Sequence, residues 1–307
     1  MMGTTVRDRL RAARRLLVLG LVLALTALVV PESTVRDTHV SLVKVQGARG
    51  IDPARDVVWV LFLGSDARPG QGMTRARADA IQLTGVNLRT GAATVIGVPR
   101  DSYVSIPGRG RDKINSAMYF GGPQLMAKAV SGLVGIRPDY VMTTDFWGFR
   151  QMINTIGGVT VRSDFSFPDP IMPRGYRRGP NELNGFQALI FTRIRKYLPR
   201  GDFDRSANQQ DMLRGILAQV RSRQDRPGFM ERGVLAAVRH MNTGVRPAEL
   251  YRLAQAATQV DPRRFRGCVI SGGVGYAGSA SVVFPNVAQA RRIAADVLRD
   301  ATLDRCC

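Results

Sequence analysis

Arginine, lysine and aspartate side chains are concentrated between Ile190 and Val220, at a density suited to binding a phosphate group. A guanidinium group presents a fixed fork of donors that matches phosphate oxygens, and neighbouring carboxylates can orient those forks or help hold a metal ion. The charged and amide side chains of this stretch are Arg193, Arg195, Lys196, Arg200, Asp202, Asp204, Arg205, Gln209 and Gln210. The same residues would also make a solvated basic loop before an ordinary amphipathic helix, and this stretch alone does not decide between the two.

The residues after Asp204 predict a helix that presents its first turn to such a site. An apolar stripe recurs there at helical spacing, and it consists of Leu213, Ile216, Leu217 and Val220. Arg205 and Gln209 precede Leu213 at intervals of four, so one helix face starts polar and becomes apolar. A helix N-terminus also favours an anion.

Arg193 and Arg195 lie two residues apart, just ahead of that helix. They would point to opposite sides if the preceding helix continued through them. We therefore expect both side chains to share one site only if the backbone is extended there.

Three turns upstream repeat the pairing of an aspartate with an arginine at the end of a predicted strand. Apolar or alternating segments predict strands over 57–63, from Ile81 and over 92–98, the first of them buried on both faces. The paired residues are Asp66 with Arg68, Arg77 with Asp79, and Arg100 with Asp101. Sites in α/β sheets form beyond strand ends, so the three turns together suggest one site, although any single pair is more often a structural ion pair.

This set of residues is suited to chemistry on a pyrophosphate. Two carboxylates, Asp66 and Asp79, together with phosphate oxygens form the ligand set that Mg²⁺ prefers, with Mn²⁺ as an alternative ion. Arginine and lysine clamps stabilise the charge that develops when a phosphoryl group is transferred. The simplest reaction is displacement on a pyrophosphate by an acceptor hydroxyl, with a carboxylate as the base.

Cysteine and histidine offer no competing chemistry. The three cysteines, Cys268, Cys306 and Cys307, give neither a disulfide framework nor a zinc-ligand spacing. The two histidines, His39 and His240, are far apart, which argues against a histidine-rich metal site and a Ser-His-Asp triad.

Charge and the N-terminus indicate the compartment. The chain has 307 residues with 44 Lys plus Arg against 24 Asp plus Glu, a net charge of +20 that attracts anions. Basic residues precede an apolar run from Leu16 to Val30, which predicts a cytoplasmic N-terminus and an exported remainder. The run spans about 22 Å as a helix, and the bulky residues after it favour an uncleaved anchor. Export argues against nucleic acid as a partner.

We therefore expect four segments. They are a cytoplasmic basic segment (1–15), a single transmembrane anchor in the cell membrane (16–31), a stalk (32–55) and an extracytoplasmic catalytic domain (56–305). Within that domain strands and helices alternate, which predicts an α/β fold.

Several local features are predicted as well. A change of phase in the second strand predicts a bulge at Gly85, and Asp145 is expected to cap a helix rather than to bind a ligand. Lys113 lies just ahead of a further predicted helix. The string from Gly273 to Gly278 has the spacing of a dinucleotide fingerprint, but a β-pattern follows it, so we interpret it as a hairpin tip.

Seven blocks of this sequence, in this order, closely resemble the LytR-CpsA-Psr family. They are GSDAR (64–68), RADAI (77–81), VPRDSYV (98–104), KINSA (113–117), NTIGGVTV (154–161), NGFQALIFTRIRK (184–196) and GDFDRSANQQ (201–210). The resemblance implies an α/β/α sandwich around a mostly antiparallel central sheet. It also implies a membrane-anchored, Mg²⁺-dependent phosphotransferase that moves a glycopolymer from a polyprenyl-pyrophosphate carrier onto peptidoglycan through a phosphodiester bond.

The resemblance also assigns roles to residues. Asp66 and Asp79 match the family's Mg²⁺ ligands, and the positions that match its grip on the pyrophosphate and headgroup are Arg77, Arg100, Lys113, Arg193, Arg195 and Arg205. Asp202 and Gln209 match polar positions of the same pocket, to which we add Arg68, and we expect Asp66, Asp79, Arg100 and Arg205 to be catalytic. Two positions depart from the pattern: Ala80 replaces a usual hydroxyl residue, and Asn208 replaces a frequent arginine.

Two other functions remain open from the sequence. A non-enzymatic binder of anionic wall polymer or polyprenyl phosphate would bind the lipid tightly without Mg²⁺-dependent turnover. A polyprenyl-pyrophosphate hydrolase would differ from the transferase only in the attacking group, water instead of a sugar hydroxyl, and pyrophosphatase activity could also accompany transfer. A lipid would need an apolar tunnel, and stripes such as Leu125, Met126, Val130 and Leu133 cannot be told from ordinary core in the sequence.

Overall fold

The computed structural model describes residues 38–52, 55–68, 70–169, 171–172, 174–229 and 241–304. The chain divides into two compact units, 1–37 and 38–307. The predicted basic segment and anchor (1–15 and 16–31) therefore lie outside the described residues. Among the described residues, no helix combines the length and the apolar character needed to cross a membrane.

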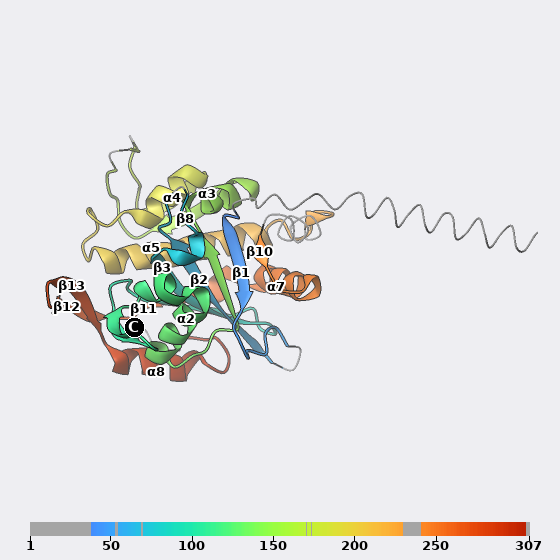
Figure 1. Ribbon diagram of the computed structural model, residues 1–307. Coiled ribbons are helices and arrows are strands. Elements are labelled where there is room, and N and C mark those ends of the chain that lie inside the picture. The colour runs from blue at the N-terminus through green and yellow to red at the C-terminus, as the bar shows by residue number, and fades with distance from the viewer. Residues whose placement is uncertain are drawn as a thin grey trace, which may run out of the picture. The chain divides into compact units, whose positions relative to one another are not determined.

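A seven-stranded mixed sheet forms the centre of the second unit (Figure 1). Its strands, in spatial order, are β10 (Asn242–Thr243), β1 (Val40–Lys44), β7 (Tyr140–Thr144), β2 (Val57–Ser65), β3 (Ala78–Asn87), β4 (Ala93–Gly97) and β11 (Phe265–Val269). Because β1 lies inside this sheet, the expected stalk over 32–55 is wrong from that strand onward.

The expectation of a mostly antiparallel sheet is also wrong. β1–β7, β2–β3 and β3–β4 are antiparallel, whereas β1–β10, β2–β7 and β4–β11 are parallel. Only the β3–β4 connection (88–92) is short, whereas residues 66–77 separate β2 from β3. The parallel neighbours return through long connections, and strand patterns alone do not specify their direction.

Helices cover both faces of the sheet, as the predicted α/β fold requires. On one face α2 (Ser116–Val134) and α8 (Val287–Val297) pack in a core that contains Met126, Val130 and Leu133, so this stripe is ordinary core. On the other face lie α5 (Asp202–Arg221) and α7 (Pro247–Gln259). A third cluster joins α3 (Phe146–Thr155), α4 (Gly185–Arg193), β8 (Val159–Ser163) and β9 (Gly179–Leu183).

Smaller elements complete the domain. They are two hairpins, β5 (Tyr103–Ile106) with β6 (Gly110–Lys113) and β12 (Gly272–Ala277) with β13 (Ala280–Pro285), and the 3-10 turns η1 (Met73–Arg75) and η2 (Pro262–Arg264). The string from Gly273 to Gly278 belongs to a hairpin, as predicted, but it forms most of β12, and only Gly278 lies at the tip. Asp145 caps α3 by accepting a hydrogen bond from the Gly148 amide at 2.8 Å. Cys268 is disulfide-bonded, which the cysteine spacing did not lead us to expect.

Gly85 serves packing and does not form a bulge. The β2–β3 register is regular at this residue and pairs it with Trp59, and the register shift lies instead between Gly64 and Ser65. A Cβ atom on Gly85 would lie 2.6 Å from the Trp59 ring, which is 1% exposed. The glycine therefore leaves room for the largest side chain of the core.

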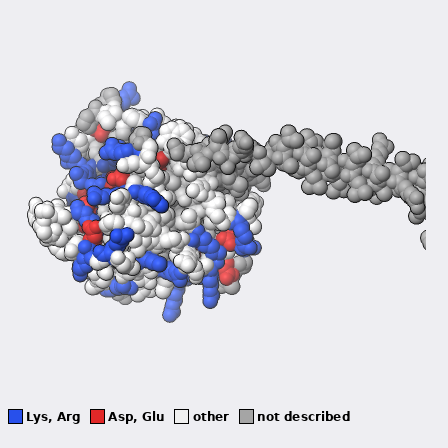
Figure 2. All heavy atoms as spheres, in the orientation of Figure 1, with Lys and Arg blue, Asp and Glu red and all other residues white. Residues whose placement is uncertain are grey.

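Charge is spread unevenly over the surface. On the face shown in Figure 2, Lys and Arg side chains outnumber Asp and Glu, and the carboxylates lie among the cations. At the left edge, where Figure 1 places β12 and β13, the surface is white.

We expect Gly85→Ala to lower the free energy of unfolding by about 1–3 kcal/mol, because the methyl group overpacks against Trp59. Gly132→Ala in α2 is the matched control, since its Cβ would meet no atom within 4 Å. Urea titration followed by far-UV circular dichroism measures both variants. Equal unfolding midpoints for the two would contradict this account of Gly85.

Candidate active site

A cavity of about 600 Å³ lies between the sheet and the helices α3, α5 and α7. One wall is α5, which contributes Arg205 and Gln209 from its first half and Leu213, Ile216, Leu217 and Val220 from its second. The predicted helix face, polar and then apolar, is thus confirmed, but its apolar part lines a cavity as well as packing against the core. At 1.5 Å per residue, this wall is about 22 Å long from Arg205 to Val220.

The remaining lining divides in the same way. The apolar lining from the sheet, α3 and α7 includes Val58, Val60, Met142, Phe149 and Leu253. The charged lining consists of Asp79, Arg100, Arg193, Arg195 and Arg205, together with Asp145 at the N-terminus of α3. The cavity is therefore amphipathic, with charged groups at the N-terminal half of α5 and apolar groups along its C-terminal half.

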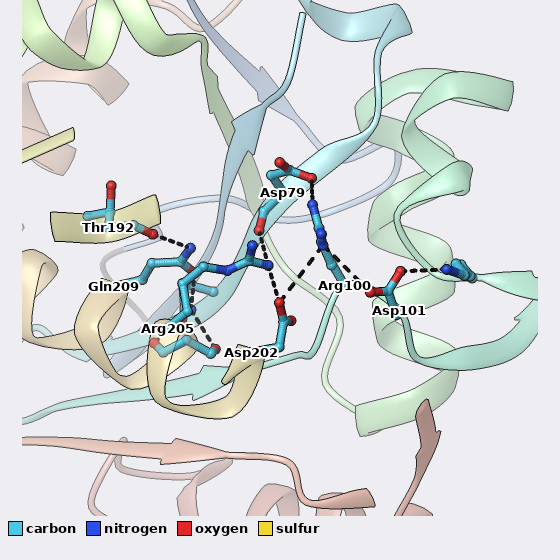
Figure 3. A network of polar contacts seen from close by, with 10 residues as sticks. Asp79, Arg100, Asp101, Thr192, Asp202, Arg205 and Gln209 are labelled. Atoms are coloured by element: carbon cyan, nitrogen blue, oxygen red, sulfur yellow. Dashed lines mark hydrogen bonds and ion pairs between the residues drawn. The ribbon is translucent and has the colours of Figure 1, made fainter. Parts of the chain in front are cut away.

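A network of alternating cations and carboxylates forms the charged part (Figure 3). Arg100 Nη1 lies 2.6 Å from Asp79 Oδ1, and Arg205 Nη2 lies 2.7 Å from Asp202 Oδ1. Arg205 also donates to the Asp79 carbonyl at 3.4 Å, and Arg100 Nε lies 4.0 Å from Asp202 Oδ1. Strand β3, the turn after β4 and the first turn of α5 thus meet in one cluster.

Asp101 extends the network, although the sequence assigned a role only to Arg100 of that pair. Its Oδ1 lies 2.9 Å from Lys113 Nζ, and its Oδ2 lies 3.6 Å from Arg100 Nε. The Arg-Asp turn in which it lies was the available signal, but adjacent residues after a strand do not show which of them faces the site.

Arg205 is a buried cation whose side chain is only 8% exposed. Burial lowers the pKa of Arg205, and the carboxylate of Asp202 acts in the opposite direction. Burial also lowers the pKa of Arg100, but its ion pair and hydrogen bond with Asp79 outweigh that effect, so the pKa is raised overall. The Nε atoms of both arginines are buried and have no hydrogen-bond acceptor among the described residues. Such donors are suited to an anion placed between them.

Asp66 and Asp79 lie at the same end of the β2–β3 ladder, where the register shifts between Gly64 and Ser65. Asp66 Oδ1 accepts a hydrogen bond from the Arg77 amide at 2.9 Å, and Asp79 Oδ1 pairs with Arg100. The second oxygen of each carboxylate carries no contact from the part of the chain that the structure describes. Two carboxylates with one uncommitted oxygen each fit Mg²⁺, which takes few protein ligands beside substrate phosphates. The described residues contain no group of three or more potential metal ligands.

Arg193 and Arg195 both line the cavity. α4 ends at Arg193, and Ile194 is extended (φ −63°, ψ 139°). The backbone is therefore extended between the two arginines, as the prediction that they share a site required. The Arg193 guanidinium also stacks on the Phe146 ring at 4.3 Å. Arg200 and Asp204 pair with each other at 2.7 Å and do not join the network.

Three predicted residues, Asp66, Arg68 and Arg77, are not joined to the network within the described residues, and Asp66 contacts only the Arg77 backbone. The side chains of Arg68 and Arg77 are exposed, and within the described residues neither contacts a member of the network. The Arg68 amide binds the Gln71 side chain at 3.1 Å. Their part in the site remains a prediction.

Gln209 lines the cavity, but its amide already has partners. Its Oε1 accepts from Gln82 Nε2 at 3.0 Å, and its Nε2 donates to the Thr192 carbonyl at 3.2 Å. Gln82 also donates to Ser206 Oγ at 3.0 Å. Gln82 was not predicted as a site residue, and the available signal was its polar side chain between Ile81 and Leu83 in the strand. This chain of hydrogen bonds joins β3 and α5 to the end of α4.

Comparison with known proteins agrees with this geometry. The model of the LytR_cpsA_psr family matches residues 24–294. The polyisoprenyl-teichoic acid–peptidoglycan teichoic acid transferase TagU of Bacillus subtilis (strain 168) is 36% identical over 191 residues, which cover 61% of this chain. The chain spans 57% of the length of that relative.

Solved structures have the same fold. The crystal structure of Bacillus subtilis TagV has a TM-score of 0.63 at 25% identity and covers 78% of this chain and 95% of its own. The YwtF (TagT) protein with bound octaprenyl pyrophosphate lipid has a TM-score of 0.60 at 23% identity, covering 81% and 93% of the two chains. Because the family model matches most of its length, and the seven sequence blocks lie within the match, the chain belongs to the LytR_cpsA_psr family.

Proposed function

We propose that this protein transfers a glycopolymer from a polyprenyl-pyrophosphate carrier onto peptidoglycan through a phosphodiester bond. The observation that carries the proposal is the amphipathic cavity, in which an apolar channel along α5 ends at a network of buried arginines and carboxylates. A polyprenyl pyrophosphate has the same division, an apolar tail and an anionic head. The name of TagU and the lipid bound by TagT support this assignment.

Burial of the tail supplies binding energy without chemistry. Each CH₂ group removed from water contributes about 0.8 kcal/mol, and the walls offered by Leu213, Leu217 and Leu253 are apolar. The tail thereby fixes where the pyrophosphate lies, next to Arg100 and Arg205. This position is what a transfer reaction needs from remote binding.

The pyrophosphate oxygens replace carboxylates as partners of the arginines. The buried Nε donors of Arg100 and Arg205 and the forks of Arg193 and Arg195 are available to them. The acceptor hydroxyl oxygen attacks the phosphorus that carries the glycopolymer, and the bond from this phosphorus to the bridging oxygen breaks. Polyprenyl phosphate leaves, and the hydroxyl proton passes to a carboxylate of the site. The arginines stabilise the charge that grows on the leaving phosphate.

We further propose that Asp66 and Asp79 hold a Mg²⁺ ion when the lipid is bound. The ion would neutralise charge on the pyrophosphate oxygens. Asp79 also orients Arg100, so the same carboxylate would contact both the Mg²⁺ ion and the Arg100 guanidinium. The extracytoplasmic location and the membrane anchor over 16–31 are part of the same proposal, supported by the basic residues ahead of the apolar run.

The decisive experiment supplies the purified full chain with a polyprenyl-pyrophosphate oligosaccharide, nascent peptidoglycan and Mg²⁺. We expect oligosaccharide covalently attached to glycan and released polyprenyl phosphate. Cleavage without attachment would assign the protein as a hydrolase. Tight lipid binding without cleavage would assign it as a binding protein.

We expect Arg205→Lys to lower the rate of pyrophosphate cleavage by about a hundredfold or more, because lysine keeps the charge but loses the fork of donors. Arg299→Lys, at an exposed residue outside the network, is the control. Thermal unfolding of both variants separates a loss of chemistry from a loss of fold. A decrease no larger than that of the control would exclude Arg205 from the reaction.

We expect Asp66→Asn to weaken Mg²⁺ binding by about tenfold or more. The measurement is the paramagnetic resonance of Mn²⁺, titrated into the protein with inorganic pyrophosphate present. Asp225→Asn changes an exposed carboxylate away from the site and should bind as the parent does. Unchanged Mn²⁺ binding in Asp66→Asn would remove this residue from the metal site.

We expect Ala254→Phe to raise KM for a long polyprenyl donor by about tenfold, because the ring occupies the channel. A short farnesyl donor should be affected much less. Gln255→Phe, which places the same ring on the exposed side of α7, is the control. If both donors were affected equally by Ala254→Phe, the cavity would not be the tail site.

A further inference from the structure

The β12–β13 hairpin is an exposed surface without charge beside a highly charged site. Residues 267–290 contain no Asp, Glu, Lys or Arg, in a chain whose net charge is +20. Figure 2 shows this region as a white protrusion at the left edge, where Figure 1 places β12 and β13. Exposed apolar patches on soluble domains mark binding surfaces more often than chance.

Backbone contacts join the hairpin directly to the charged network. The Val283 amide donates to the Asp101 carbonyl at 2.9 Å, and Val283 forms a parallel bridge with Ser102. The carboxylate of the same Asp101 holds Lys113 at 2.9 Å. The hairpin is therefore continuous with the site that grips the pyrophosphate.

Two aromatic rings form the part of this surface nearest to the network, and we name them the aromatic corner: Tyr103 and Phe284. Their ring centroids are 6.0 Å apart, with an angle of 81° between the planes. Tyr103 pairs across β5–β6 with Lys113, so the two side chains lie on one face of that ribbon. Phe284 is 44% exposed, and its ring lies over Gly275.

The space beside the Phe284 ring is open. Gly273 is its direct partner across the hairpin, and a Cβ atom on Gly273 would meet nothing within 4 Å. The guanidinium of Arg111 stacks on Tyr103 at 5.1 Å, which leaves Phe284 as the ring that faces solvent. Val274 and Tyr276, 73% and 74% exposed, project from the opposite face of the hairpin.

The chemistry of the reaction points to one occupant. In the proposed function, on which this inference rests, the cavity takes the lipid tail and the arginines take the phosphates. The acceptor has to reach the phosphorus from outside the cavity. A sugar ring presents apolar C–H faces that pack on an aromatic ring, and it does not need a cation. We propose that the aromatic corner binds an uncharged amino-sugar ring of the acceptor glycan strand next to its reacting hydroxyl.

Neither other class of occupant matches the surface as well. An anionic polymer would find cations only beside Tyr103, where Lys113 already pairs with Asp101 and Arg111 stacks on the ring, and none on the hairpin itself. The apolar run that would enter a bilayer leads in sequence to β1, next to one edge of the sheet, whereas the hairpin follows β11 at the other edge.

Phe284→Ala and Phe284→Leu in the full chain test the proposal, with two readouts. The first is KM for nascent peptidoglycan in the transfer assay, which we expect to rise about tenfold in both variants. KM for the lipid donor and the rate of cleavage without acceptor should stay at the parental values. The second is binding of chitopentaose, an uncharged amino-sugar oligosaccharide, which we expect to weaken by the same factor.

Two variants serve as controls. Phe284→Tyr keeps the ring and should retain the parental KM, and Tyr276→Ala removes an exposed ring from the opposite face and should change nothing. Leucine preserves apolar bulk, so the Phe284→Leu variant keeps the test valid if the alanine variant fails to fold.

The outcomes separate this inference from the proposed function. If the parent protein transfers no polymer but Phe284→Leu still loses chitopentaose binding, the proposed function fails and the aromatic corner stands as a glycan site. If the parent transfers polymer while Phe284→Leu keeps both parental values, the aromatic corner is not the acceptor site. Loss of binding to lipid vesicles without a change in acceptor KM would also overturn it and assign the hairpin to the membrane.

Discussion

The architecture of the site depends on ion pairs between partly buried arginines and carboxylates, which hold the guanidinium groups in fixed orientations. A buried guanidinium without a partner is strongly unfavourable, and the Arg205 side chain is 8% exposed. Asp79, Asp101 and Asp202 neutralise the cations in place, yet each carboxylate is 20–26% exposed and can yield its partner to a stronger anion. The arginine forks are thus fixed before substrate arrives, which is the condition for electrostatic stabilisation without reorganisation.

The apolar channel follows from how α5 is attached to the sheet. In its first half, Ser206, Gln209 and Gln210 hydrogen-bond to β3, β4 and β11 through Gln82, the Val95 carbonyl and the Cys268 carbonyl. Hydrogen bonds have a narrow range of lengths and angles, so these bonds set the distance of the helix from the sheet. The second half of α5 forms no such hydrogen bonds with the described strands of the sheet, and Leu213, Leu217 and Val220 line the cavity. One helix therefore holds to the sheet, carries part of the charged network and lines the cavity along its length.

The sequence predicted what depends on local pattern. The amphipathic face of α5, the Asp145 cap, the hairpin around Gly275 and the aspartates at strand ends all follow from spacing within a few residues. Features that depend on tertiary neighbours were missed. The direction of β7, β10 and β11 is set by long crossovers, and Gly85 is explained only by the Trp59 ring across the ladder. The sequence shows the polar side chains of Gln82 and Asp101 but not the residues that they contact. Arg68 and Arg77 have the residue type expected of a phosphate site, but their side chains are exposed. A lipid channel and a packed core are made of the same apolar residue types, so the residues alone did not predict a lipid substrate. The glycopolymer transfer was predicted from the family resemblance.

The hydrogen bond from the Val283 amide to the Asp101 carbonyl joins segments that are synthesised at very different times. The chain is made from its N-terminus, so Arg100 and Asp101 emerge long before the hairpin that supports their backbone. Strand β11, which pairs with β4 next to the same turn, arrives equally late. The charged network cannot take its final form until nearly the whole domain has been synthesised, since contacts between distant segments form late in folding. A truncated or still-emerging chain would hold the arginines without their geometry, so the charged network can form only when the polypeptide is nearly complete.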